Sequence, residues 1–270
     1  TADALGGSDR ESRTAPIGEA WFGDANETPG TLLVKLLDVR ERLSVQVHPD
    51  DRLAARLHGP GAMGKHEAWV ILDAAPGAAL LLGRSESAAP SDLVDAIRSG
   101  SGAEAMLARL QVLPGDVVDV PPGLVHALLP GLFVWEVQQP TERTYRVSDW
   151  GRNDPSRPLH LAESAAATDG AARGRIAARL DGDAPGLQSL LSTPRFSIRA
   201  VVGPFAGSLR VATGTIATIV ETPGAAQPLR RDAAATVDAR PCAAWSSFQV
   251  SGAPNLVVPG GLAVLLAELA

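Results

Sequence analysis

The chain has 270 residues, of which 45% are hydrophobic, and it carries a net charge of −6 with a pI of about 5.4. This composition excludes a disordered polar chain, and the acidic balance argues against a nucleic-acid binder, because such domains are normally basic. The single cysteine, Cys242, excludes an internal disulfide framework and fits a reducing cytoplasm.

The two ends of the chain predict neither a signal peptide nor a membrane span. Residues 1–14 are polar, without the apolar run of a signal peptide, and we expect them to be a disordered N-terminal segment. The most apolar stretch, 255–270, is interrupted by Pro259-Gly260-Gly261 and is too short to cross a bilayer. We therefore predict a cytoplasmic protein with no membrane or nucleic-acid partner.

A first strong strand is predicted over residues 31–39, TLLVKLLDV, where Lys35 interrupts an apolar run. A lysine in this position either extends its amine to solvent at a sheet edge or points into a cavity to meet an anion. The spacing alone favours neither interpretation.

The segment that follows, 43–67, carries most of the polar side chains of the predicted site. Gln46 and His48 stand at i and i+2 of an alternating run, so their side chains leave the same face of a strand. Lys65 and Glu67 repeat this spacing ahead of the apolar run 68–72, after a short helix expected at 51–57. Two adjacent strands would present an imidazole, an amide and a carboxylate to one space. Lys65 would lie beside them, either paired with Glu67 or available to a substrate oxyanion or a proton.

Further along, helices predicted over 91–110 interrupt the strands, the first with Ser91 as its N-cap and Gly100 near its C-terminal end, the second over 104–110. Strands resume at 116–120, 126–128, 132–138 and 144–147, with Pro/Gly turns between them, a spacing typical of a jelly roll.

A fourth candidate ligand, His126, lies just beyond the turn Pro121-Pro122-Gly123. The predicted metal set is Gln46, His48, Glu67 and His126, with room for water or substrate. Imidazole and oxygen ligands with an open position suit catalytic zinc, with manganese, iron, cobalt or nickel as alternatives. Taken singly, either histidine could be an ordinary surface or hydrogen-bonded residue.

The last part of the chain predicts an Ala/Gly-rich connector over 165–195 and a second set of strands over 196–270. The second set has no histidine, since the last one is His160, and so it cannot repeat the metal set. We expect it to cover the open side of the first domain or to form a dimer contact, in a monomer or homodimer.

Several of these segments, in this order, resemble the type I mannose-6-phosphate isomerases, which are metal-dependent cupins, and especially their short bacterial form. The resemblance is strong from about 15 to 165 and weak afterwards. Its segments are GEAW at 18–21, LLVKLLDVRERLSVQVHPDD at 32–51, GKHEAWVIL at 64–72, PPGLVHAL at 121–128, EVQQPTERTYRVSDWGR at 136–152 and RPLHL at 157–161.

The resemblance implies a mainly β fold, with a cupin jelly-roll barrel over 15–164, a helical insertion at about 91–110 and a degenerate cupin-like domain over 196–270. It implies interconversion of mannose 6-phosphate and fructose 6-phosphate through a cis-enediol, with a sugar phosphate as the partner. Lys35 and Ser44 would lie near the sugar or phosphate, and Arg146 would stabilise negative charge. Lys65, Glu19 and Glu136 are the candidate acid–base groups.

Two alternatives stay open at this point. One is a different metal-cupin enzyme, such as an isomerase for another sugar or an iron oxygenase, because the segment 22–30 is short and PTERTYR at 140–146 departs from the family's usual SSDTTYR. The other is a sugar-binding or structural cupin without turnover. Arg146 and Glu19 could then be ordinary surface residues.

Overall fold

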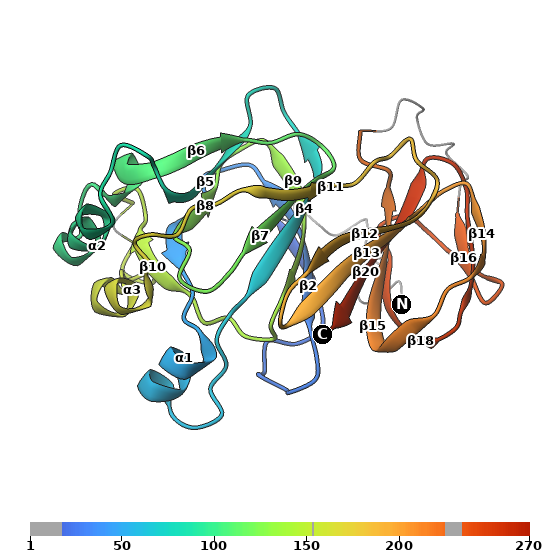
Figure 1. The fold of residues 1–270 in the computed structure, drawn as a ribbon, viewed down its shortest axis with the longest axis horizontal. Helices are drawn as coiled ribbons and strands as arrows, with labels where there is room; N and C mark the ends of the chain where they lie inside the picture. The colour runs from blue at the N-terminus through green and yellow to red at the C-terminus, as the bar shows by residue number, and fades with distance from the viewer. Residues whose placement is uncertain (1–17, 153, 225–233) are drawn as a thin grey trace.

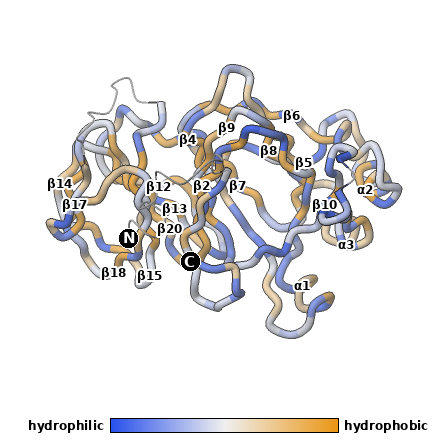
Figure 2. Tube along the Cα trace, turned by 180° about the vertical axis from the view of Figure 1, so that it is seen from behind, coloured by the Kyte–Doolittle hydropathy of each residue, from blue (hydrophilic) through white to orange (hydrophobic). Residues whose placement is uncertain are grey.

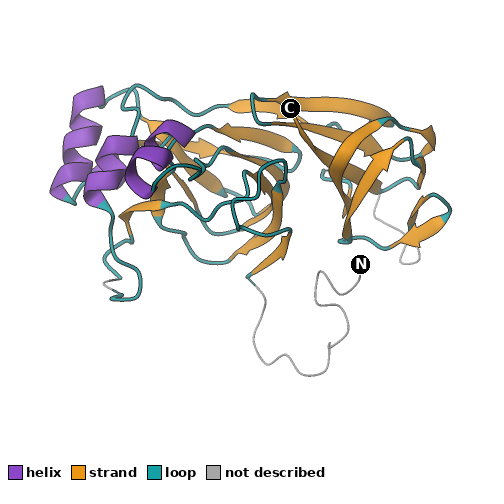
Figure 3. Cartoon of the chain, turned by 90° about the horizontal axis from the view of Figure 1, so that it is seen from below, coloured by secondary structure: helices purple, strands orange, loops and turns teal. Residues whose placement is uncertain are grey.

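The computed structural model describes residues 18–152, 154–224 and 234–270, so the predicted disordered segment 1–14 lies outside the described residues. The mainly β prediction is confirmed, with strands forming two units side by side and the α-helices at the far end of the first unit (Figures 1 and 3). All strand pairings in the described part are antiparallel.

The first unit has two facing sheets, ordered β1-β2-β9-β4-β7-β11 and β10-β3-β8-β5-β6. Among the described strands these two sheets are not joined into a closed barrel, so the jelly roll is a two-sheet sandwich. Its strands are β1 (Glu19–Phe22), β2 (Leu33–Val39), β3 (Val45–Val47), β4 (Glu67–Ala74), β5 (Ala79–Arg84), β6 (Leu107–Gln111), β7 (Asp116–Val120), β8 (His126–Leu128), β9 (Leu132–Gln138), β10 (Tyr145–Ser148) and β11 (Ile176–Arg179).

The helical elements are α1 (Asp51–His58), α2 (Pro90–Ser99), the short 3-10 helix η2 (Ala103–Met106) and α3 (Leu161–Ala167). The predicted helix at 51–57 is confirmed. Asp50 caps it, accepting a hydrogen bond from the backbone N–H of Leu53 at 2.6 Å. In α2, however, the N-cap is Ala89 and not Ser91, because Pro90 takes the first helical position.

The second unit also has two sheets, ordered β12-β13-β20-β15-β18 and β14-β19-β16-β17. Its strands are β12 (Gly186–Ser192), β13 (Phe196–Val202), β14 (Phe205–Ser208), β15 (Val211–Glu221), β16 (Ala235–Val237), β17 (Arg240–Cys242), β18 (Ser247–Gly252), β19 (Asn255–Val258) and β20 (Leu262–Leu269).

Besides the N-cap of α2, two further local predictions were wrong. The second helix expected over 104–110 is only η2, and residues from Leu107 onward form β6, which pairs with β5 and completes the second sheet of the first unit. The connector expected over 165–195 contains β11, which pairs with β7, and β12, which pairs with β13. For β6 and β11, pairing with a strand well separated in the chain outweighs a local composition rich in Ala, Gly and helix-forming residues, whereas β12 forms a hairpin with the adjacent β13.

A continuous core joins the units. The outer face of the β2-β9-β4-β7 sheet packs against the β13-β20-β15 sheet, so that Trp135 and Phe196 share one buried cluster. Trp135 also donates a hydrogen bond across the junction from Nε1 to Thr218 Oγ1 at 3.0 Å. Figure 2 shows the apolar segments along the strands where the units meet. The second unit therefore covers the outer face of the sheet whose inner face carries the site.

The described residues contain no helix that is both long and apolar enough to cross a membrane.

Candidate metal centre

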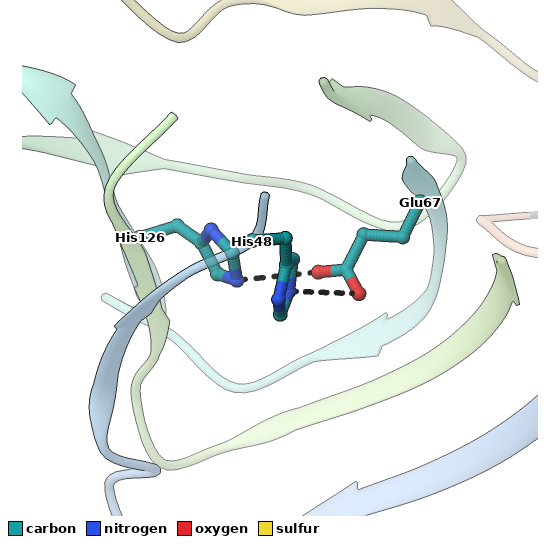
Figure 4. Close-up of side chains that lie close together, drawn as sticks. All are labelled: His48, Glu67 and His126. Atoms are coloured by element: carbon teal, nitrogen blue, oxygen red, sulfur yellow. Dashed lines mark ion pairs between the residues drawn. The ribbon is translucent and has the colours of Figure 1, made fainter. Parts of the chain in front are cut away.

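Three of the four predicted ligands meet inside the first unit. His48 follows β3, Glu67 begins β4 and His126 begins β8, so the two facing sheets both contribute (Figure 4). The Nε2 atoms of His48 and His126 lie 3.3 and 3.2 Å from Oε2 and Oε1 of Glu67, and all three side chains are fully buried. One ligand atom from each residue lies within 4.8 Å of the others.

Local chain features bring these side chains together. Gln46 is the register partner of His126, and the backbone N–H of Gly123 in the Pro-Pro-Gly turn donates to the carbonyl of His48 at 2.9 Å. Gly64 lies so close to the start of α1 that a Cβ there would stand 2.4 Å from the carbonyl carbon of Asp50. Only glycine allows this approach, which delivers the chain into β4 at Glu67.

Each imidazole is oriented with Nε2 toward the centre. Nδ1 of His48 lies 3.2 Å from the backbone carbonyl of Arg143, and Nδ1 of His126 lies 2.8 Å from that of Leu124. A carbonyl can only accept, so Nδ1 carries the proton in both rings and Nε2 presents its lone pair. This is the arrangement that metal-binding histidines use.

The charges around the centre favour the ligand forms of these groups. Burial, with the nearby Lys65 ammonium, lowers the pKa of His48 from 6.5 to about 3, so His48 is neutral at physiological pH and forms no ion pair with Glu67. Burial alone raises the pKa of Glu67, but the adjacent Lys65 ammonium holds it well below its usual value. A neutral imidazole and an ionised carboxylate are the forms that bind metal.

The four inward atoms have no hydrogen-bond partner in the described structure: Nε2 of both histidines and both oxygens of Glu67 are buried and orphaned. Oε2 of Glu67 forms an ion pair with Lys65 Nζ at 2.7 Å, which balances part of the carboxylate charge, so the two imidazole nitrogens and Oε1 are the atoms left without any partner. Lone pairs facing one another in a dry interior are unfavourable unless a cation lies between them. The residues therefore fit a divalent metal, and two imidazoles with a carboxylate are a ligand set typical of zinc.

Gln46 and Ser44 are two further predicted site residues, on β3 and just before it. Gln46 lies on β3 directly opposite His126 and shares the face of His48, so its amide is positioned to be the fourth ligand. Ser44 is buried just before β3. Both remain predicted site residues.

A row of alternating charges extends from the centre along the inner face of the first sheet. Burial alone lowers the pKa of Lys65, but Glu67 and then Glu136 outweigh it and raise that pKa. Glu136 accepts a hydrogen bond from Trp69 Nε1 at 3.0 Å and faces Lys35 Nζ at 3.5 Å. Lys35 is thus buried on the inner face, 4.2 Å from the centroid of the Trp21 ring, and the solvent-exposed alternative is excluded.

Arg146 and Glu19 lie at the edges of this arrangement. Arg146 is the register partner of Gln46, and its Nη1 donates to the carbonyl of Pro158 at 2.9 Å, while its buried Nε has no partner in the described structure. Burial, and next the charge of Arg157, lowers the pKa of Arg146. Glu19 is exposed on β1, and within the described residues no hydrogen bond or ion pair links it to the three ligands.

Sequence reasoning missed two parts of the surroundings. Trp69 lies at i+2 from Glu67, so its place on the inner face could have been predicted, and its ring lies 5.4 Å from that of His126. The Arg143 carbonyl that holds His48 gave no signal, because any residue can supply a backbone carbonyl.

The fold and the site together define a protein of two packed β-sandwich units, the first enclosing a buried centre of two histidines and one glutamate suited to a divalent metal. Comparison with known proteins shows which family this chain is similar to. The family model for the catalytic domain of type I phosphomannose isomerase matches residues 7–64. Mannose-6-phosphate isomerase ManA of Bacillus subtilis is 39% identical over 146 residues, which is 53% of this chain and 45% of that protein.

Solved structures agree with this relationship. The crystal structure of the mannose 6-phosphate isomerase from Bacillus subtilis aligns with 88% of this chain and 74% of its own, at a TM-score of 0.65 and 27% identity. A zinc-bound mannose 6-phosphate isomerase shares the fold at a TM-score of 0.62 and 13% identity, over 95% of this chain and 89% of its own. The predicted resemblance is confirmed: the chain is similar to type I mannose-6-phosphate isomerases in sequence over about half of its length and in fold over most of it. It spans about half the length of the curated relatives that it matches.

Proposed function

We propose that this protein is a metal-dependent aldose–ketose isomerase that interconverts mannose 6-phosphate and fructose 6-phosphate. The observation that carries the proposal is the buried, orphaned set of Nε2 and carboxylate atoms on His48, Glu67 and His126, with two buried lysines in the same unit. Similarity to named mannose-6-phosphate isomerases supports this reaction over that of a different cupin enzyme.

The reaction moves a proton between C2 and C1 while the carbonyl moves from C1 to C2, through a cis-enediol. Zinc held by Gln46, His48, Glu67 and His126 would supply Lewis-acid stabilisation of the negative charge that develops on the sugar oxygens. The protein's part is to bind the sugar phosphate, to keep water away and to hold the groups that transfer the proton.

The two lysines provide local positive charge in a protein whose net charge is −6. Lys65, beside Glu67, would meet an oxyanion of the sugar at the reacting end, and Lys35, further along the row, would meet the sugar or its phosphate together with Ser44. Because the two cations lie on either side of Glu136, a linear anionic substrate could span them.

For the transferred proton, Glu136 has more structural support than Glu19. Glu136 is buried on the inner face between Lys35 and Trp69, whereas Glu19 is exposed at the edge strand. A base must reach the reacting carbon from inside the site. Glu19 stays a prediction from the family resemblance.

Arg146 would supply a permanent positive charge at the rim. Its position opposite Gln46 supports a role in stabilising the enediolate, because a guanidinium stays ionised and can donate two hydrogen bonds side by side.

The test is a coupled assay of mannose 6-phosphate conversion to fructose 6-phosphate, before and after chelation and with zinc added back. We expect turnover that is lost with chelator and restored by zinc. Absence of turnover in a folded, zinc-loaded sample would refute the isomerase and point to another sugar substrate or to a binding role.

A further inference from the structure

We infer that Glu27 and Arg143 form a clamp that positions the His48 ligand; the role in zinc binding rests on the metal site of the proposed function. The clamp consists of Glu27, Met63, Thr141 and Arg143, which come from three separate loops. None of these side chains is a metal ligand, so the inferred role is positioning and not catalysis.

The need for a clamp follows from an asymmetry between the two histidines. His126 takes its orienting carbonyl from Leu124, two residues away on the same local segment, at 2.8 Å. His48 takes its carbonyl from Arg143, which is 95 residues away, at 3.2 Å. Arg143 lies in the turn between β9 and β10, outside any strand, so no sheet ladder holds its carbonyl. The direction of the His48 ring therefore depends on what holds this turn.

Buried Gln138 holds the start of this turn, donating from Nε2 to the carbonyl of Thr141 at 2.6 Å, and the side chains of Arg143 and Glu27 hold the part that carries the Arg143 carbonyl. Arg143 forms an ion pair with Glu27 through Nη2 and donates from Nε to the carbonyl of Met63 at 3.1 Å. Glu27 Oε1 also accepts from Thr141 Oγ1 at 3.0 Å, and Glu27 Oε2 accepts from the backbone N–H of Met63 at 3.2 Å. Both carboxylate oxygens and two guanidinium nitrogens are therefore engaged, in charge-assisted contacts.

The backbone of Glu27 is itself held in an uncommon conformation. Its φ is +57°, in the left-handed region that non-glycine residues rarely adopt, and its N–H donates to the carbonyl of Pro140 at 2.7 Å. Such a conformation persists where surrounding contacts enforce it, and here it aims the carboxylate at Arg143 and Met63.

The clamp reaches the other side of the centre as well. Met63 precedes Lys65 by two residues and Glu67 by four, so the same carboxylate that holds Arg143 also holds the loop leading into β4. Two of the three ligands, His48 and Glu67, are thus tied to one partly buried ion pair. His126, held locally, is independent of it.

The test measures zinc affinity, by competition with a chromogenic chelator, for Arg143→Ala, Glu27→Ala and the double variant. We expect each single variant to bind zinc about 10- to 100-fold more weakly, as is typical when an outer partner of a ligand is lost. The double variant should be no weaker than the worse single variant, because the two residues act as one unit. Arg199→Ala is the matched control: it breaks a comparably buried ion pair with Glu268 in the second unit and should leave zinc affinity unchanged.

A second measurement separates positioning from general loosening. In the metal-free protein, nitrogen-15 NMR of labelled histidine should show that Arg143→Ala releases His48 from the Nδ1–H tautomer while His126 retains it. Zinc affinity within about twofold of wild type in a folded variant, or an unchanged His48 tautomer, would overturn the inference. If Arg143→Ala does not fold, the same two measurements are made on Glu27→Gln and decide whether the inference holds. This variant keeps the shape of the side chain and removes its charge. Neither depends on turnover, so a zinc-binding protein without isomerase activity would refute the proposed function and leave this test intact.

Discussion

Replacing His126 by leucine should have little effect on stability without zinc and a large effect with it. In the metal-free protein the buried Nε2 of His126 faces a carboxylate oxygen at 3.2 Å with no hydrogen bond, and an orphaned buried polar atom costs about 1–3 kcal/mol. Leucine has a similar volume and removes that atom, but it leaves the carbonyl of buried Leu124 without its donor, a penalty of the same size, about 1–3 kcal/mol. We therefore expect the two effects largely to cancel, so that His126→Leu without metal has a stability within about 2 kcal/mol of wild type.

With zinc the wild type should be clearly the more stable of the two. A ligand that binds only the folded state stabilises it by about 2.7 kcal/mol at a concentration 100 times its Kd, and we expect this gain in wild type and none in His126→Leu. The assay is urea unfolding followed by fluorescence of the five tryptophans, in chelator and in buffered zinc. His66→Leu is a control of the opposite kind. His66 Nε2 is satisfied by Asp119 at 2.7 Å, so this variant should lose stability without metal and keep the zinc gain.

Two results would refute this reasoning. If metal-free His126→Leu were destabilised by more than about 3 kcal/mol, His126 would belong to a satisfied hydrogen-bond network, because only broken buried networks or cavities cost so much. If the variant kept the full gain from zinc, His126 would not be a ligand.

Three further predictions concern charge, chemistry and packing. The metal-free protein should lose stability as pH falls from 6.5 to 4.5, by up to about 1.4 kcal/mol per pH unit. The lowered pKa of His48 means that the unfolded chain binds the proton first. His48→Leu should flatten this window, and a wild-type free energy of unfolding that is constant across it would contradict the burial argument. Arg146→Ala should retain zinc but lower kcat about a hundredfold, the usual cost of removing one charge-stabilising donor; unchanged turnover would remove Arg146 from the mechanism. Phe196→Ala, at a fully buried position between the units, should cost about 3–5 kcal/mol in urea unfolding, and a cost below 1 kcal/mol would show that the units do not share a core.

The candidate metal site could be predicted from the sequence to an unusual degree, and the reason is local geometry. Alternation along an extended chain predicts that Gln46 and His48 share a face and that Lys65 and Glu67 share another, although His48 and Lys65 lie just outside the strands β3 and β4. The confirmed strands at 116–120, 126–128 and 132–138 are bounded by Pro and Gly turns. The local sequence therefore also determines where these strands begin and end. The residue types then indicated a metal without any knowledge of distance.

Tertiary structure alone decided which of these faces meet. The Arg143 carbonyl that sets the His48 tautomer, the Glu27 contact and the β11 strand within the predicted connector all depend on segments far apart in the chain. Lys35 left two interpretations open until the structure placed it against Glu136 on the inner face, with the second unit covering the outer one. A side-chain period specifies a face, but burial, hydrogen-bond satisfaction and pKa depend on what packs against that face, and this is a property of the folded chain.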